Sequence, residues 1–194
     1  MKMFFSIVLF TMISAIGVSQ ESMRIMDPRD GTSYEIVEIG NQTWMAQNLS
    51  YDMLGSFVYE DKPSYEDIYG RLYVWEVATV VCPDGWHLPD ASEWDELILF
   101  LGGAREAGKY LAQTESKKSG DSIAHMYEFN SIPSGNRDLS GSYNNLEQYA
   151  YYWTATEGDS IAARRIIIAD KGASIGGGYG NKTSAYSVRC IKND

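Results

Sequence analysis

The sequence predicts an α+β fold in which a few short helices accompany a sheet region rich in glycine and asparagine. Three observations point to this class. An alternating stretch with a turn signal follows Asp30, a capped amphipathic pattern follows Leu88, and the last third consists of short aromatic and β-branched runs separated by turn residues. The 194 residues, 44% of them hydrophobic and 22% charged, suffice for one buried core. We therefore expect a single domain over residues 20–194.

Residues 1–19 have the pattern of a secretory signal peptide. Lys2 precedes an apolar run over residues 3–16, and Val18 and Ser19 suit cleavage before Gln20. The alternative is an N-terminal membrane anchor, but the apolar run is shorter than the roughly 20 residues that span a bilayer. No later segment is apolar enough to span a membrane either. We expect an exported protein, either secreted or held at the cell envelope or outer surface, whose mature chain has no membrane span.

The charge balance excludes some classes of partner. The net charge is −10, and removal of Lys2 with the leader makes it −11. A nucleic acid or an anionic membrane surface attracts a basic face, which this composition does not favour. We expect neither nucleic acid nor membrane lipid as a partner, and the acidic surface serves solubility.

The first expected element is a β-hairpin. Within DGTSYEIVEIGNQTWMAQNL (30–49), residues 34–39 alternate between two faces, and Gly40-Asn41 supplies a turn before a second run at 43–45. The segment from Ser50 to Ser64 is rich in Asp, Gly, Ser and Pro, which favours irregular structure.

Three short helices are expected next. In YGRLYVWEVATVVC (69–82), Leu72, Trp75, Ala78 and Cys82 recur at helical spacing. In LPDASEWDELILFLGG (88–103), a capping box precedes an apolar stripe and Gly102-Gly103 ends the helix. A third helix is expected over Ala104–Ala112, followed by a polar loop at Ser116–Asp121. The capping box consists of Asp90 and Glu93, and the stripe of Trp94, Leu97, Ile98 and Leu101.

The last third is expected to form sheet. Tyr151–Thr156, Arg165–Ala169 and Ser184–Ile191 read as strands, because aromatic and β-branched residues cluster there between turn residues. Gly176–Gly180 has no Lys-Ser/Thr after it and is not a phosphate loop, so we expect a flexible or tight loop between strands. The residues that we expect to fill the core are Trp44, Trp75, Trp86, Leu88, Trp94, Trp153 and much of Tyr149–Tyr152.

Cys82 and Cys190 are the two cysteines of the chain. In an exported protein an even count of two favours one disulfide over two free thiols. Such a bridge would close a long loop and would contribute about 4 to 5 kcal/mol in the chain-entropy model.

The stretch ATVVCPDGWHLPDASEWDELI (78–98) brings a thiol, an imidazole and two carboxylates close together in sequence. A zinc or copper site there has too few Cys and His ligands, and Asp90 and Glu93 are better explained as a helix cap. A Cys82 nucleophile needs a base within reach. In an extended WHLP segment His87 points away from Trp86 and Leu88, toward the surface or a hydrogen-bond partner. We expect no metal site and no catalytic residue here.

The chain contains five blocks in this order: DGTSYEIVEIGNQTWMAQNL (30–49), YGRLYVWEVA (69–78), CPDGWHLPDASEWDEL (82–97), IPSGNRDLSGSYNNLEQYAYYWTATE (132–157) and YSVRCIKND (186–194). Their content and order resemble the Fibrobacter succinogenes major paralogous domain, and the resemblance covers the chain from about Asp27 to its C-terminus. This family resembles the C-type-lectin-like fold, which implies short helices packed on small, twisted, mostly antiparallel sheets with long loops. The lectin-like signature corresponds here to Trp75, Ala78, Cys82, Gly85, Leu88 and Glu93. The resemblance also implies a disulfide between Cys82 and Cys190.

The resemblance implies a binding module that is not an enzyme. Calcium-dependent sugar binding in lectin-like domains uses Glu-Pro-Asn or Gln-Pro-Asp with Trp-Asn-Asp, and none of these motifs occurs. A structural calcium ion is conceivable but unsupported, so no cofactor is expected. In this family the segment from Glu157 to Ala185 can be a tolerant ligand-contacting face. Its candidate binding residues are Glu157, Asp159, Arg164, Arg165, Asp170, Lys171, Tyr179, Asn181 and Lys182.

We therefore expect a secreted or surface-associated bacterial module that recognises an unknown protein or glycan ligand at the cell surface. One alternative is an enzyme-like relative of the formylglycine-generating, sulfatase-modifying branch. That chemistry depends on a pair of cysteines in the C-terminal region, where this chain has only Cys190. A second alternative is a structural subunit of a surface assembly.

Overall fold

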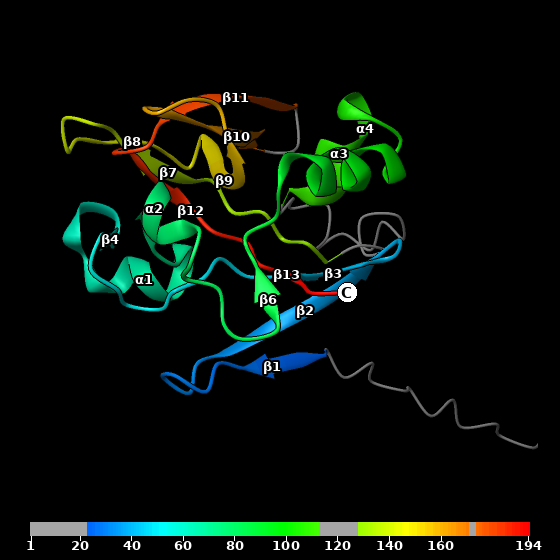
Figure 1. The fold of residues 1–194 in the computed structure, drawn as a ribbon, viewed down its shortest axis with the longest axis horizontal. Coiled ribbons are helices and arrows are strands. Elements are labelled where there is room, and N and C mark those ends of the chain that lie inside the picture. Colours follow the sequence, from blue (N-terminus) through cyan, green and yellow to red (C-terminus); the bar gives the residue numbers. More distant parts are fainter. Residues whose placement is uncertain (1–22, 113–127, 171–173) are drawn as a thin grey trace, which may run out of the picture.

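The computed structural model describes residues 23–112, 128–170 and 174–194 (Figure 1). The protein is an α+β fold with two curled, mostly antiparallel sheets and short helices beside them. The expected leader, the polar loop at Ser116–Asp121 and Lys171 lie outside the described residues. No helix within the described ranges combines the length and the apolarity needed to cross a lipid bilayer.

The smaller sheet has five strands in the order β1-β2-β3-β13-β6. The expected hairpin is confirmed, because β2 pairs antiparallel with β3 and Ile39 lies opposite Gln42. Gly40 has a φ of 63° in the connecting turn, a backbone conformation that glycine adopts readily. β13 lies between β3 and β6, so the C-terminal segment completes this sheet. The strands are β1 Arg24–Met26, β2 Ser33–Ile39, β3 Gln42–Met45, β6 Trp86–His87 and β13 Ile191–Lys192.

The larger sheet has the order β11-β10-β9-β7-β12-β5-β4, with β8 paired to β7. The strands expected at 151–156 and 165–169 are confirmed as parts of β9 and β10. The strand expected at Ser184–Ile191 is two strands, β12 and β13, which belong to different sheets. The remaining bounds are β4 Ser56–Phe57, β5 Leu72–Val74, β7 Ser134–Arg137, β8 Tyr143–Leu146, β9 Tyr149–Glu157, β10 Ala162–Ala169, β11 Ile175–Asn181 and β12 Ala185–Ser187.

The expectation of a loop at Gly176–Gly180 is wrong. These residues lie in β11, which pairs antiparallel with β10 over seven residue pairs at the edge of the larger sheet. Backbone pairing with β10 continues through the four glycines, and Ile175 of the same strand is buried in the core. At Gly180 a Cβ atom would lie 2.6 Å from the ring of Tyr186, so the close packing of this strand requires a glycine there.

The helices are only partly as expected. The helix predicted for residues 69–82 is wrong in its first half, because Leu72–Val74 form β5 and only Trp75–Ala78 form α2. β5 pairs with β12, a partner more than 100 residues away that local periodicity cannot reveal. Helix α1 at Pro63–Tyr69 was not expected, although Pro63 suits a first helical turn. A 3-10 turn occupies Tyr59–Asp61 (η1).

Helix α3 at Ala91–Phe100 and helix α4 at Ala104–Leu111 confirm the other two predictions. The Asp90 carboxylate accepts hydrogen bonds from the N–H groups of Ser92 and Glu93 at 2.7 and 3.0 Å, and Glu93 Oε2 accepts from the Asp90 N–H at 2.7 Å. This is the expected capping box. The stripe that follows packs in a core cluster with residues of both sheets, and its Trp94 and Leu97 are buried.

Aromatic rings fill much of the core. The rings of Trp44 and Trp94 are 4.8 Å apart, and Tyr152 lies 5.6 Å from Trp94. A second cluster joins Trp153 and Tyr186 to residues around the disulfide. The expected burial is confirmed for Trp44, Leu88, Trp94, Trp153, Tyr151 and Tyr152, whereas Trp75 and Trp86 are only partly buried and Tyr149 is exposed.

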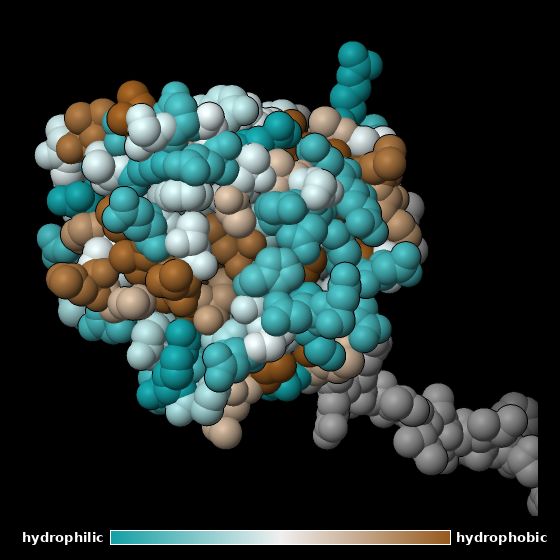
Figure 2. Space-filling view, viewed as in Figure 1, coloured by the Kyte–Doolittle hydropathy of each residue, from teal (hydrophilic) through white to brown (hydrophobic). Residues whose placement is uncertain are grey.

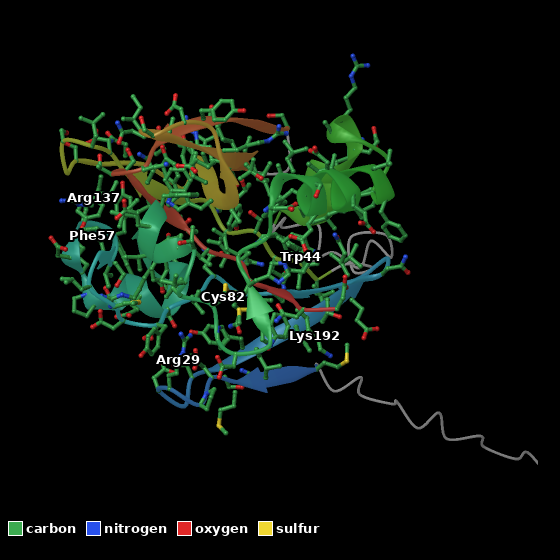
Figure 3. The ribbon with its side chains drawn as sticks, in the orientation of Figure 1. Arg29, Trp44, Phe57, Cys82, Arg137 and Lys192 are labelled. Atoms are coloured by element: carbon green, nitrogen blue, oxygen red, sulfur yellow. A yellow bond between two sulfur atoms is a disulfide. The ribbon has the colours of Figure 1, made fainter. Side chains whose placement is uncertain are left out.

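The disulfide between Cys82 and Cys190 is present, as both the cysteine count and the family resemblance predicted (Figure 3). It joins the loop that follows α2 to the segment between β12 and β13. Next to it, Arg189 is buried and donates to several carbonyl oxygens. Its Nε lies 2.8 Å from Asn48 Oδ1, its Nη2 lies 2.9 Å from the carbonyl of Asn130, and its Nη1 donates to the carbonyls of Met45 and Phe129. Burial lowers the pKa of this guanidinium from its ordinary value.

Candidate functional site

The sequence-predicted ligand face does not lie on one side of the larger sheet. Neighbouring residues of a strand point to opposite faces, and this separates Arg164 from Arg165. Arg165 lies over the rings of Tyr151 and Tyr186, at 5.2 and 5.0 Å from their centroids, and donates to the Tyr186 hydroxyl. Arg164 pairs with Asp95 of α3 at 3.4 Å.

Four other predicted residues order the ends of β9, β10 and β11. Lys182 forms an ion pair with Glu157, and its Nζ lies 4.4 Å from the Trp75 ring centroid. Asp159 Oδ1 accepts from two backbone N–H groups at 2.8 Å, and Asn181 Oδ1 accepts from the N–H and hydroxyl of Thr183. These contacts build turns.

Tyr179 is another exposed residue of the predicted face, with 59% of its surface exposed. Its ring packs over Gly158, where a Cβ atom would lie 2.6 Å away. Asp170 follows the end of β10, and its N–H donates to the carbonyl of Gln148 at 2.8 Å. The role of the segment as a ligand face stays a prediction, since each side chain described above also has a local structural contact.

The stretch around His87 forms a polar network. His87 Nε2 lies 2.8 Å from Glu93 Oε1 and Nδ1 lies 2.7 Å from Asn193 Oδ1, so Glu93 serves both the helix cap and the imidazole. Burial opposes protonation of the imidazole. The hydrogen bonds to Asn193 and Glu93, together with the charges of Glu93 and Asp90, outweigh that effect and raise the pKa of His87 from its ordinary value. Within the part of the chain that the structure describes, no three His, Cys, Asp or Glu side chains are arranged to hold a metal ion.

A polar cleft of about 620 Å³ lies elsewhere, between the turn that joins β1 to β2, the segment after β3, and helix α1. In Figure 1 helix α1 stands above that turn, and Figure 3 labels Arg29 on the turn itself. We call this the α1 cleft. Six of its lining residues carry the groups best suited to contact a ligand: Asp30, Gln47, Tyr51, Asp52, Glu66 and Asp67.

The walls of the α1 cleft are held in place by their own hydrogen bonds. Arg71 donates to Asp52 Oδ1 at 2.6 Å and to Glu66 Oε1 at 2.7 Å, and so ties the loop before β4 to α1. The Arg29 guanidinium lies 3.9 Å from the ring centroid of Tyr51 and fixes that ring. A site whose side chains are already ordered loses less conformational entropy when a ligand binds.

A further surface feature is an apolar patch beside α2 and β4, visible in brown in Figure 2. Leu54 in the loop before β4 is 96% exposed, and Val80 after α2 is 65% exposed. Gly55 packs against Val77 of α2, where a Cβ atom would lie 2.8 Å from the valine side chain.

Sequence reasoning missed the α1 cleft because its residues form no motif. The six residues named above lie between Asp30 and Asp67, in the β1–β2 turn, in the segment after β3 and in helix α1. The Tyr51-Asp52 pair in a polar segment was the only local signal. The cleft exists because tertiary packing brings the β1–β2 turn against an unexpected helix.

The comparisons with known proteins agree with the resemblance seen in the sequence. The family model of the Fibrobacter succinogenes major domain (Fib_succ_major) matches residues 37–192. No curated protein and no solved structure matches the chain. The matched region contains both cysteines, α1 to α4 and most strands of both sheets. The chain belongs to the Fibrobacter succinogenes major domain family.

Proposed function

We propose that this protein is an exported, non-catalytic binding module that recognises a protein or glycan ligand at the cell surface, and that the α1 cleft is its recognition site. The cleft carries the proposal. Its volume of about 620 Å³ lies within the roughly 300–1,000 Å³ that is usual for ligand sites. Polar side chains and a tyrosine ring line it, and internal hydrogen bonds hold several of them in place.

The finer fold assignment that we propose is C-type-lectin-like. Its support is the bridge from Cys82, just after α2, to Cys190 on the segment that enters β13, together with helix α3 that begins beside Glu93. Export is supported by the signal-peptide pattern of residues 1–19 and by the disulfide, which is typical of oxidising compartments.

The oxidation of both cysteines to a disulfide disfavours the enzyme-like alternative. Formylglycine-generating chemistry needs reactive thiols, and both cysteines of the chain are joined in the disulfide. A thiol titration of the folded protein tests this point. Two reactive thiols would reopen the enzyme hypothesis, and none would leave the chain without a thiol for such a reaction.

The recognition site is tested with a binding screen of the purified oxidised chain against arrays of glycans and of surface proteins. We expect the double variant Gln47→Ala/Asp67→Asn to lose binding and Tyr179→Ala to retain it. The opposite result would place recognition on the sequence-predicted face. Loss in neither variant would remove both surfaces as recognition sites. A measurement of the molecular mass of the same sample in solution tests whether the protein is a structural subunit of a surface assembly. A monomer would count against that alternative.

A further inference from the structure

The α1 cleft is built to accept hydrogen bonds from a ligand. Four carboxylates line it, and three use one oxygen internally: Asp52 Oδ1 and Glu66 Oε1 accept from Arg71, and Asp30 Oδ1 accepts from the Thr32 N–H. Among the described residues, the second oxygen of each has no hydrogen-bond donor, and neither has the carboxylate of Asp67. Each of the three anchored groups is therefore held by one oxygen and presents the other.

The charges around the cleft argue against an anionic ligand. Arg71 is only 12% exposed at its side chain, and its three donor nitrogens are engaged by Ser56, Glu66 and Asp52. Arg29 is paired with Asp27 at 2.6 Å. A phosphate, sulfate or carboxylate group would meet like charges here without a free cation nearby, which is an unfavourable arrangement.

The cleft also offers groups that a purely cationic ligand cannot satisfy. Gln47 Oε1 accepts from the Glu35 N–H at 2.9 Å, which leaves the amide nitrogen to donate into the cleft. An ammonium group has no acceptor for that donor, whereas a sugar hydroxyl both donates and accepts. Arg29 covers one face of the Tyr51 ring, and the ring lines the cleft with its partly buried surface. Such a ring can pack against the apolar C–H face of a sugar.

We propose that the α1 cleft binds a neutral oligosaccharide, with sugar hydroxyls donating to the free oxygens of Asp52, Glu66 and Asp67 and one hydroxyl accepting from the Gln47 amide. This inference rests on the proposed recognition role of the cleft and specifies its ligand class. The cleft volume of about 620 Å³ accommodates a short saccharide rather than a single polar group.

The test is calorimetric titration of the full oxidised chain with named probes. The neutral probes are cellohexaose, mannohexaose, xylohexaose and maltohexaose, the acidic probe is hexagalacturonate, and the cationic probe is tetralysine. We expect at least one neutral hexasaccharide to bind and hexagalacturonate not to bind. The double variant Gln47→Ala/Asp67→Asn should weaken that binding at least tenfold. Asp84→Asn is the matched control, because it removes one exposed carboxylate outside the cleft lining and should leave the affinity unchanged.

Three outcomes overturn the inference: no neutral hexasaccharide binds, tetralysine or hexagalacturonate binds more tightly than all four, or the double variant binds as well as the control. These outcomes are separable from failure of the broader proposal. If the double variant loses a protein ligand found in the screen while no sugar binds, the cleft is a recognition site and only its ligand class is wrong. Circular dichroism of both variants confirms that each is folded.

Discussion

Loss of the Cys82–Cys190 disulfide should cost this protein a large part of its stability. The bridge spans 108 residues of sequence. In the chain-entropy model a loop of that length removes about 16 cal/mol/K from the unfolded state, which is about 4.8 kcal/mol at 25 °C. Domains of this size are typically stable by about 5–15 kcal/mol, so the double variant Cys82→Ala/Cys190→Ala should lose between about a third and nearly all of the stability.

Guanidinium chloride unfolding measures the effect, with the fluorescence of the buried tryptophans as the signal. Three samples are compared: the oxidised protein, the reduced protein, and the double alanine variant. The last two should agree within about 1 kcal/mol, because both lack the cross-link and differ only in the two sulfur atoms. The reasoning is refuted if the double variant loses less than about 1 kcal/mol relative to the oxidised protein.

Three further perturbations follow from other features. Arg189→Met should lower stability by about 3 kcal/mol in urea unfolding, because buried carbonyl oxygens lose their donors, and an unchanged midpoint would contradict this. The pKa of His87 is raised on folding, so the protonated imidazole stabilises the folded state. This stabilisation is fully present below about pH 6.5 and is lost as pH rises through the folded-state pKa. In thermal melts from pH 5 to 9, the native protein should therefore lose stability relative to His87→Gln as the pH rises. The loss should be less than about 1 kcal/mol, because the His87 side chain is 42% exposed. A stability difference that stays constant with pH would contradict this role of His87. Gly180→Val should lower the melting temperature strongly through its clash with Tyr186, whereas Gly176→Val, where a Cβ meets no other atom within 4 Å, should change it little. Equal effects at the two glycines would remove the packing argument.

The elements that could be predicted from the sequence are those with complete local signals. Helix α3 is an example, because its cap, its apolar stripe and its terminating glycines all lie within fourteen residues. The β2–β3 hairpin is similar, with its alternation and turn in one stretch. Elements with distant partners were not predictable. Leu72–Val74 have helical spacing but are held as a strand by β12, and the glycines of β11 are ordered by β10.

In the candidate sites, too, features with a local sequence signal could be predicted, and features that depend on distant contacts could not. The pairing of the disulfide could be predicted because a chain with two cysteines allows one intramolecular pairing. The helix-cap roles of Asp90 and Glu93 were also predictable, and His87 was expected at the surface or in a hydrogen bond. The α1 cleft could not be predicted, because its residues become neighbours only when α1 packs near the β1–β2 turn. Likewise, a buried Arg189 coordinated by carbonyl oxygens leaves no pattern in the sequence.

The position of the last strands has a consequence for the timing of biosynthesis. β12 lies inside the larger sheet and β13 inside the smaller one, and the segment between them supplies Arg189 and Cys190. A ribosome makes these residues after every other described strand. Neither sheet can close while the chain is still being translated, so the nascent protein remains open until residues 185–192 have been added.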